Sequence, residues 1–420
     1  MSIALTTLGN GVRVVTHEMP DLYTASLSIQ INAGSRDERA DQHGLSHLLE
    51  HMAFKGTHSR SALEIVESIE AVGGDLNAAT SVESTTYYAR VLKENIDLGI
   101  DILADILGNS KIDSKELERE QHVILQEIGA AHDTPDDMVF DHALETAFDG
   151  QAIGRPILGT EEAVTGFQKA HITEYLESHY HAPSMIIAAS GGVKHDQLVG
   201  YCENLFSTFK NLSAPQRDVA RYTGGSYIDD KPLEQVHLIL GFEGIAYHDE
   251  DIYAAQILSG ILGGGMSSRL FQEIREKRGL CYSIYSFHWS FSDTGFFGIY
   301  GATSEEDCQE LMPVTLDVIK SVLDDIDEAE LSKTKAQVKA ALMMTLENSA
   351  ARADQLARHV HTFGHVRTTE DILQSVNKVG KNEIIAVAER IFSSPPTLSA
   401  IGPVQKLMRA DSIKDYLSKA

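Results

Sequence analysis

The chain has little cysteine, few basic residues and no long hydrophobic run, and each of these shortages argues against a class of protein. Its three cysteines, Cys202, Cys281 and Cys308, are odd in number and lack CxxC spacing, so neither a disulfide framework nor a cysteine zinc site is indicated. The 35 Lys and Arg against 61 Asp and Glu give a net charge of −26, which argues against a nucleic-acid-binding protein. No run of about 18 apolar residues is present, and MSIALTTLGNGVRVV lacks the features of a signal peptide. We therefore expect a cytoplasmic protein without membrane spans.

The chain has enough residues and enough apolar side chains for more than one core. At 420 residues, of which 43% are hydrophobic, two or more domains are expected. Residues 24–32 alternate apolar and polar side chains and predict a half-buried strand, and VRVVTH and STTYYARVL predict two more. Helices are expected over 62–72, over NIDLGIDILADIL and over KELEREQHVILQEI, which a cap at Asp113 and Glu116 precedes.

The second half of the sequence repeats the order of the first about 210 residues later. VHLILGFEGIAYHDE corresponds to ASLSIQINAGSRDE, and NEIIAVAERIFSSPPTLSAIGPV corresponds to HITEYLESHYHAPSMIIAASGGV. Between the halves, residues 211–234 are polar, contain Gly, Pro and Ser, and show no clear periodicity. We predict an α+β protein of two homologous domains, 1–210 and 235–420, each a mostly antiparallel sheet packed with helices, joined by a linker at 211–234.

The stretch HLLEH, residues 47–51, is the strongest chemical signal in the first half. Residues four apart lie on one face of a helix, so His47 and His51 can present two imidazoles to one metal ion with Glu50 alongside. The alternative is a helix whose histidines face solvent or form ordinary hydrogen bonds. The corresponding residues of the second half read LSGIL and cannot bind a metal, which indicates that the fold does not need these polar groups and that the first copy keeps them for chemistry.

A catalytic zinc ion needs a third protein ligand and an open position for water. The helix that ends in HVILQEI offers Glu127, with Glu120 two turns earlier near the same face. A glutamate on a helix is more often simply solvated, so the residues alone leave the third ligand open.

Several motifs together resemble those of the pitrilysin family of metallopeptidases. HxxEH is the inverted zinc-peptidase motif, and it is followed in order by GGDLNAATSVESTTYYARVL, EREQHVILQEI, GRPILGTEE, HYHAPSMIIAASG and GGGMSSRLFQEIREKRGLCYSIYS. The resemblance covers essentially the whole chain and is closest to the mitochondrial processing peptidase branch with its short bacterial relatives. It implies a zinc-dependent endopeptidase with one zinc ion per chain.

The resemblance also implies roles for individual residues. The third zinc ligand is Glu127, which Glu120 supports, and Glu50 is the general base. An arginine and a tyrosine from the second half assist the scissile carbonyl, at Arg275 and Tyr282, with Arg278 as the alternative arginine.

Substrate contacts follow from the same resemblance. Asn77 and Ala78 contact an extended peptide at a sheet edge, although the residues alone favour a plain connection between helix and strand. Asp137 and Asp141 recognise a basic residue before the cleaved bond. Phe54 lines the pocket after that bond, although a phenylalanine is more often part of a core.

Three functions remain open at this point. The first is a zinc endopeptidase that acts on peptides or unfolded segments. The second is a non-catalytic core or partner subunit of a larger assembly, because relatives in the family serve in that way. The third is a zinc hydrolase of other small substrates. Long family members join four such domains, so a chain with two is expected to form a homodimer, or a heterodimer with a related chain.

Overall fold

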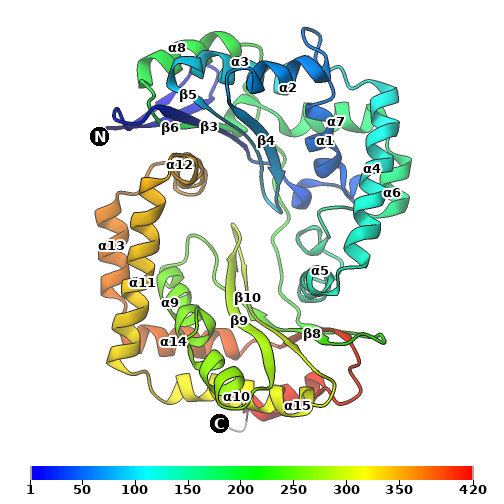
Figure 1. Cartoon of the computed structure of the whole chain (residues 1–420), viewed down its shortest axis with the longest axis vertical. Coiled ribbons are helices and arrows are strands. Elements are labelled where there is room, and N and C mark those ends of the chain that lie inside the picture. Colours follow the sequence, from blue (N-terminus) through cyan, green and yellow to red (C-terminus); the bar gives the residue numbers. More distant parts are fainter. Residues whose placement is uncertain (1, 419–420) are drawn as a thin grey trace. The chain divides into compact units, whose positions relative to one another are not determined.

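The structure, a computed structural model, describes residues 2–418, and the chain divides into two compact units (Figure 1). Unit 1 consists of the chain up to Gly129, Arg155–Asp218 and Leu342–Arg367. Unit 2 consists of Ala130–Gly154, Val219–Ala341 and the chain from Thr368 onward. Each unit holds one sheet packed with helices, which confirms the predicted α+β class.

Unit 1 is built on a six-stranded sheet. All neighbouring strands are antiparallel except β2 and β6, which are parallel. In the order in which they pair, the strands are β1 (Ile3–Thr7), β2 (Arg13–Glu18), β6 (Met185–Gly191), β3 (Thr24–Ile31), β5 (Thr85–Leu92) and β4 (Asp75–Thr80).

Helices cover both faces of this sheet (Figure 1). Helices α3 and α8 pack on one face, and α12 packs on β2, β3 and β6 from the other. The helices of unit 1 are α1 (Leu45–Ala53), α2 (Ala62–Glu70), α3 (Ile96–Gly108), α4 (Ser114–His132), α6 (Glu161–Gly166), α7 (Lys169–His179), α8 (His195–Leu205) and α12 (Ser349–Phe363).

Strand β3 differs from its prediction because it is buried on both faces. Its apolar residues pack into the main core, as the alternation predicts, but Ser26, Ser28 and Gln30 are buried as well. Helix α12 covers their side of the sheet, and the Ser26 hydroxyl lies 2.9 Å from that of Ser349. The polar residues of β3 therefore face a helix and not water.

Unit 2 repeats the sheet of unit 1 without a counterpart of β1. Its order, β7-β11-β8-β10-β9, corresponds strand for strand to β2-β6-β3-β5-β4, including the single parallel pair. The strands are β7 (Gly225–Asp230), β11 (Thr397–Gly402), β8 (Val236–Glu243), β10 (Gly295–Thr303) and β9 (Cys281–Ser290). This correspondence supports the repeat inferred from the sequence.

One face of the second sheet is covered by a helix from the first half of the chain. Helix α5 packs on β7, β8 and β11, while α9 contacts β9 and α14 contacts β8. The helices are α5 (Pro135–Ala147), α9 (Ile252–Gly263), α10 (Cys308–Asp324), α11 (Glu328–Glu347), α13 (Thr369–Lys378), α14 (Lys381–Phe392) and α15 (Ala410–Ser418).

The two halves of the chain thus exchange one helix each. Helix α5, from the first half, belongs to unit 2, and α12, from the second half, belongs to unit 1. Strand β7 lies inside the segment predicted as a linker, where GSYIDD has only Tyr227 and Ile228 as strong strand formers and so gives no clear period. The domain limits drawn from the sequence repeat stay a prediction.

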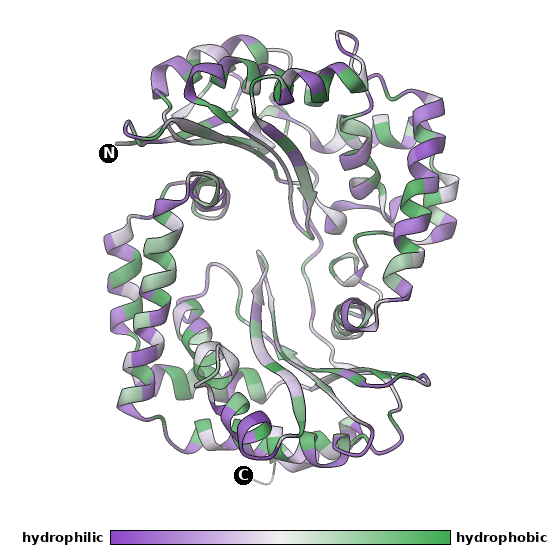
Figure 2. Ribbon diagram, in the orientation of Figure 1, coloured by the Kyte–Doolittle hydropathy of each residue, from purple (hydrophilic) through white to green (hydrophobic). Residues whose placement is uncertain are grey.

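The helices carry hydrophilic and hydrophobic residues side by side, as expected where one face packs and the other meets solvent (Figure 2). Within residues 2–418, no helix combines the length and the apolar character that crossing a membrane requires.

Candidate metal centre

The HLLEH stretch lies on α1, as the spacing predicts. One face of this helix packs into the core of unit 1 through Leu45, Leu48, Leu49 and Met52. His47, Glu50 and His51 remain partly exposed on the side away from this apolar stripe. The sequence therefore separates a packing face from a polar face that stays open to a ligand.

The start of α1 is held by a buried carboxylate that the sequence analysis missed. The backbone N–H groups of Gly44 and Ser46 donate to the two oxygens of Glu38, at 2.8 and 2.6 Å. These are among the N–H groups that a helix start leaves without partners. Burial raises the pKa of Glu38 to about 7, against the lowering effect of the two N–H groups. No motif marks this residue, because it precedes the helix by seven positions.

The residue before α1, at position 44, has to be a glycine. Its φ of 94° lies in the left-handed region, and a Cβ atom there would stand 2.8 Å from the carbonyl oxygen of Leu158. The segment around Leu158 therefore packs directly against the start of α1.

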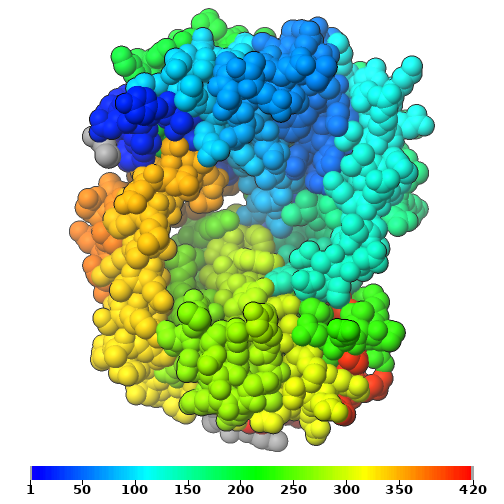
Figure 3. Space-filling model, viewed as in Figure 1, coloured from blue at the N-terminus to red at the C-terminus, as the bar shows by residue number. Residues whose placement is uncertain are grey.

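Helix α4 supplies the two glutamates expected from the sequence. Glu120 is buried, whereas the side chain of Glu127 is 42% exposed. Figure 3 shows this part of the chain, in cyan, at the surface of the molecule. The two residues are seven positions apart, so both lie on the face of α4 that is directed at α1.

Three side chains converge into a potential metal site. Ligand atoms of His47, His51 and Glu127 all lie within 4.8 Å of one another. The Nε2 atoms of His47 and His51 stand 3.6 and 3.7 Å from the same Glu127 oxygen. Ligands about 2.1 Å from a zinc ion in tetrahedral geometry stand about 3.4 Å apart, so the spacing and the N2O donor set fit a zinc ion with one position open.

The protonation of the two histidines suits metal binding. The Nδ1–H of His51 donates to Glu120 Oε2 at 3.1 Å, which leaves its Nε2 free to ligate. The other oxygen of Glu120 lies 2.8 Å from the ammonium of Lys55. Burial lowers the pKa of His47 to about 4, helped by His51 and opposed by Glu127, so its imidazole is neutral at pH 7.

Glu50 is not part of the converging triad, and a different group holds it. The Thr80 hydroxyl donates to Glu50 Oε2 at 2.6 Å. Thr80 is the last residue of β4, and the sequence analysis missed it. The alternation of Leu76, Ala78 and Thr80 on one side of β4 is the signal that was available.

Strand β4 is the edge of its sheet, where a further strand can add. Asn77 is exposed and Ala78 is buried. The Ala78 N–H donates to the Asn77 side-chain oxygen at 2.8 Å. Phe54, at the end of α1, is half-buried against the core of unit 1, which agrees with the core alternative as well as with a pocket wall.

Unit 2 brings Arg275 and Tyr282 together. Arg275 lies on a π-helical turn, Phe271–Glu276, and its guanidinium carbon is 4.7 Å from the Phe271 ring centre and 4.5 Å from that of Tyr282. Tyr282 is 75% exposed, so its hydroxyl is accessible. Arg278, the alternative arginine, donates instead to the Glu273 carboxylate at 2.8 Å.

The counterpart of α1 in unit 2 is α9, which carries neither histidine nor glutamate. Leu258, Ile261 and Leu262, from LSGIL, are buried. Helices α10, α13 and α14 contact α9. The repeat therefore packs apolar residues where the first copy exposes histidines.

Asp137 and Asp141 lie on α5. Asp137 is exposed, whereas Asp141 is mostly buried. Burial raises the pKa of Asp141 to about 6, and the nearby Glu145 and Asp137 add to this effect while His142 opposes it. A carboxylate held in this way favours a positive charge beside it.

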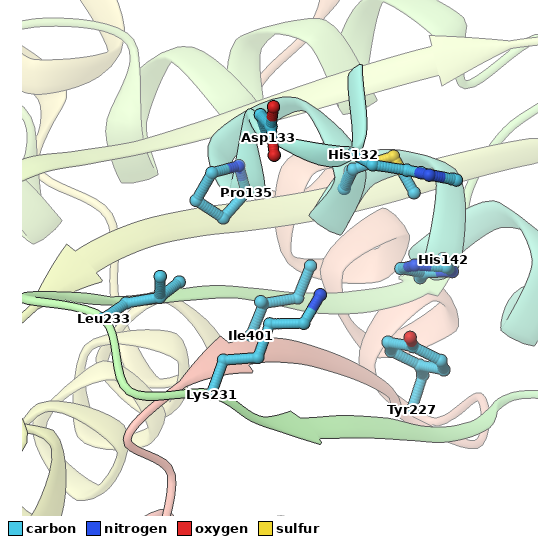
Figure 4. Close-up of a pocket in the computed structure, with 9 residues that line it drawn as sticks. His132, Asp133, Pro135, His142, Tyr227, Lys231, Leu233 and Ile401 are labelled. Atoms are coloured by element: carbon cyan, nitrogen blue, oxygen red, sulfur yellow. The ribbon is translucent and has the colours of Figure 1, made fainter. Parts of the chain in front are cut away.

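A cavity of about 520 Å³ lies elsewhere in unit 2 (Figure 4). His142 and Tyr227 stack along one side of it with ring centres 3.8 Å apart, and Lys231 and Ile401 line another. None of the site residues predicted from the sequence lines this cavity.

Comparisons with known proteins identify the family and the fold of the chain. The family model described as insulinase (peptidase family M16) matches residues 13–161, and that of the peptidase M16 inactive domain matches 166–338. A Rickettsia felis protein described as an uncharacterized zinc protease is 39% identical over 94% of this chain and 96% of its own. A Bacillus subtilis protein described as the uncharacterized zinc protease YmxG is 35% identical over 94% of this chain and 97% of its own. The crystal structure of a Helicobacter pylori protease has the same fold, with a TM-score of 0.88 at 23% identity over 95% of this chain and 99% of that one.

Proposed function

The chain belongs to the insulinase family of peptidases, family M16, and on this premise we propose that it is a zinc-dependent endopeptidase of peptides or extended protein segments. The convergence of His47, His51 and Glu127, with Glu50 beside them and outside the ligand set, is the observation that carries this proposal. A scaffold protein needs none of these four groups.

In this proposal His47, His51 and Glu127 hold the zinc ion. When bound, zinc supplies a Lewis acid that polarises the scissile carbonyl and lowers the pKa of a water molecule. Glu50 accepts the proton of the attacking water and passes it to the leaving amine. Glu120 keeps His51 in the ligating tautomer through the hydrogen bond to Nδ1.

The remaining predicted residues act on the substrate. Asn77 and Ala78 bind it as an added strand at the β4 edge, and the Asn77 side chain leaves the Ala78 N–H when the peptide arrives. Arg275 and Tyr282, which unit 2 holds side by side, stabilise the oxyanion of the tetrahedral intermediate. Phe54 contacts the residue after the cleaved bond.

The finer specificity proposed is for a basic residue before the cleaved bond, as in the processing peptidases. Asp137 and Asp141 are the groups that would select it. The acidic surroundings of Asp141, which include Glu145, favour a cationic partner. We also propose a dimer, in which the zinc site of one subunit works with Arg275 and Tyr282 of its partner.

The test combines metal analysis with peptide cleavage. We expect one zinc ion per chain and cleavage of an internally quenched peptide that contains arginine, with slower cleavage of the matched citrulline peptide. Changing His47 and His51 together to Ala should remove the zinc. Zinc without cleavage of any member of a peptide library would favour a hydrolase of small substrates, and the absence of both would favour a non-catalytic subunit.

A further inference from the structure

The Thr80 hydroxyl contacts the group proposed as the general base. It stands 2.6 Å from Glu50 Oε2 and 3.4 Å from the Ser46 carbonyl oxygen. A hydroxyl has one proton to donate, so the shorter contact to the carboxylate dominates. Within residues 2–418, no other side chain donates a hydrogen bond to Glu50. The orientation of this carboxylate therefore depends on one residue.

The geometry of β4 determines where that hydroxyl points. Leu76, Ala78 and Thr80 lie on the less exposed side of the strand, whereas Asp75, Asn77 and Ala79 are exposed. Helix α1 packs against β4 on this inner side. Strand β4 pairs with β5 alone and forms the edge of its sheet. Thr80 therefore belongs to the edge strand and also contacts the proposed base.

We infer that Thr80 is a positioning residue that orients the Glu50 carboxylate and links the β4 edge, where a peptide adds, to the general base. This inference rests on the proposed function. A carboxylate free to rotate spends much of its time away from the attacking water, so the loss of the hydroxyl slows turnover without removing a substrate contact. Loss of the Thr80 hydroxyl should therefore lower kcat and leave KM nearly unchanged.

The experiment compares three variants with the zinc-loaded enzyme. Thr80→Val keeps the shape and removes the donor, and Thr80→Ser keeps the donor. Thr86→Val is the matched control, because Thr86 lies on the neighbouring strand between buried Thr85 and Tyr87 and so points to the other face. We expect Thr80→Val to lower kcat about ten- to a hundredfold with KM within about twofold, and zinc content to be unchanged.

Rescue separates positioning from a general structural role. Thr80→Ser should restore most of kcat, and Thr86→Val should leave it within about twofold. An unchanged kcat in Thr80→Val, or an equal loss in Thr80→Ser, overturns the inference while the proposed function stands. A wild-type enzyme that cleaves no peptide refutes the proposed function instead, and with it any catalytic role of Thr80.

The contact itself is tested without turnover. Urea unfolding of the metal-free wild type, Thr80→Val, Glu50→Ala and the double variant forms a double-mutant cycle. The hydrogen bond predicts that the double variant loses less stability than the sum of the two single changes. Simple additivity of the midpoint shifts would show that the two side chains do not interact and would overturn the inference.

Discussion

Replacing Asp141 with Asn should raise the free energy of unfolding of unit 2, because it removes a negative charge that is held in a mostly buried position. The Asp141 side chain is mostly buried on α5, and within residues 2–418 no side chain donates a hydrogen bond to it. Burial raises its pKa to about 6, and at pH 7 the folded protein still holds it mostly ionised. Asn has nearly the same shape and no charge to desolvate.

The size of the gain follows from the two pKa values. An Asp at 3.8 in the unfolded chain and at about 6 in the folded one binds its proton more tightly when folded. Below pH 3.8 both states are protonated and the carboxyl costs nothing. As pH rises through the window to 6 the unfolded state loses its proton first, so the folded state becomes less stable, by up to about 3 kcal/mol at pH 8 and about half of that at pH 5.

The single tryptophan offers a direct signal. Trp289 lies on β9 of unit 2, and its ring centre is 5.7 Å from that of Phe140 on α5. Its fluorescence during urea unfolding therefore reports the unit that carries Asp141, which matters because two units need not unfold together. Metal-free protein keeps zinc binding out of the pH dependence.

Asp137→Asn is the control. Asp137 is exposed in the first turn of α5, where a negative charge is mildly favourable, so its replacement should destabilise by about 0.5 kcal/mol or less. A gain for Asp141→Asn that is equal at pH 5 and pH 8, or no gain at all, would refute the reasoning. If the proposed substrate preference is right, the same stabilised variant should discriminate less between arginine and citrulline peptides, which identifies Asp141 as a residue kept for function at the expense of stability.

Three further predictions address the metal centre and the assembly. Glu50→Gln should retain zinc by metal analysis and lose cleavage, because the base is changed and the ligands are not; undiminished turnover would contradict the mechanism. Glu120→Gln should weaken zinc affinity about 10- to 100-fold in a chelator competition, because His51 loses the carboxylate that orients it; an unchanged affinity would show that this contact is only structural. Mixing Glu50→Gln with Tyr282→Phe under conditions of subunit exchange should restore activity if each site takes groups from both chains, and failure despite proven exchange would refute the shared site.

Much of the fold was predictable because its signals are local. The alternation over 24–32, the apolar stripes of α3 and the cap before α4 each identify an element from its own residues. Strands β1 and β7 were not predicted, because both are short and exposed edge strands whose residues show little contrast between faces. The burial of Ser26, Ser28 and Gln30 was also beyond local reasoning, because it depends on α12, a helix more than 300 residues away in the sequence.

The same difference between local signals and long-range contacts explains which site residues were predicted. His47 and His51 were found from one helical turn, and Glu127 was only one candidate until the resemblance selected it, because nothing local says which glutamate of α4 faces α1. The groups that hold the site in place, Glu38 at the start of α1 and Thr80 at the end of β4, were missed for a physical reason. Glu38 accepts two N–H groups at the start of α1, and Thr80 donates one hydrogen bond to α1 from another element. A lone carboxylate or hydroxyl of this kind leaves no period or spacing in the sequence. The two histidines lie on one helix and therefore keep a fixed spacing, whereas Glu127, Glu38 and Thr80 come from other elements. Their partners are visible only once the elements are packed.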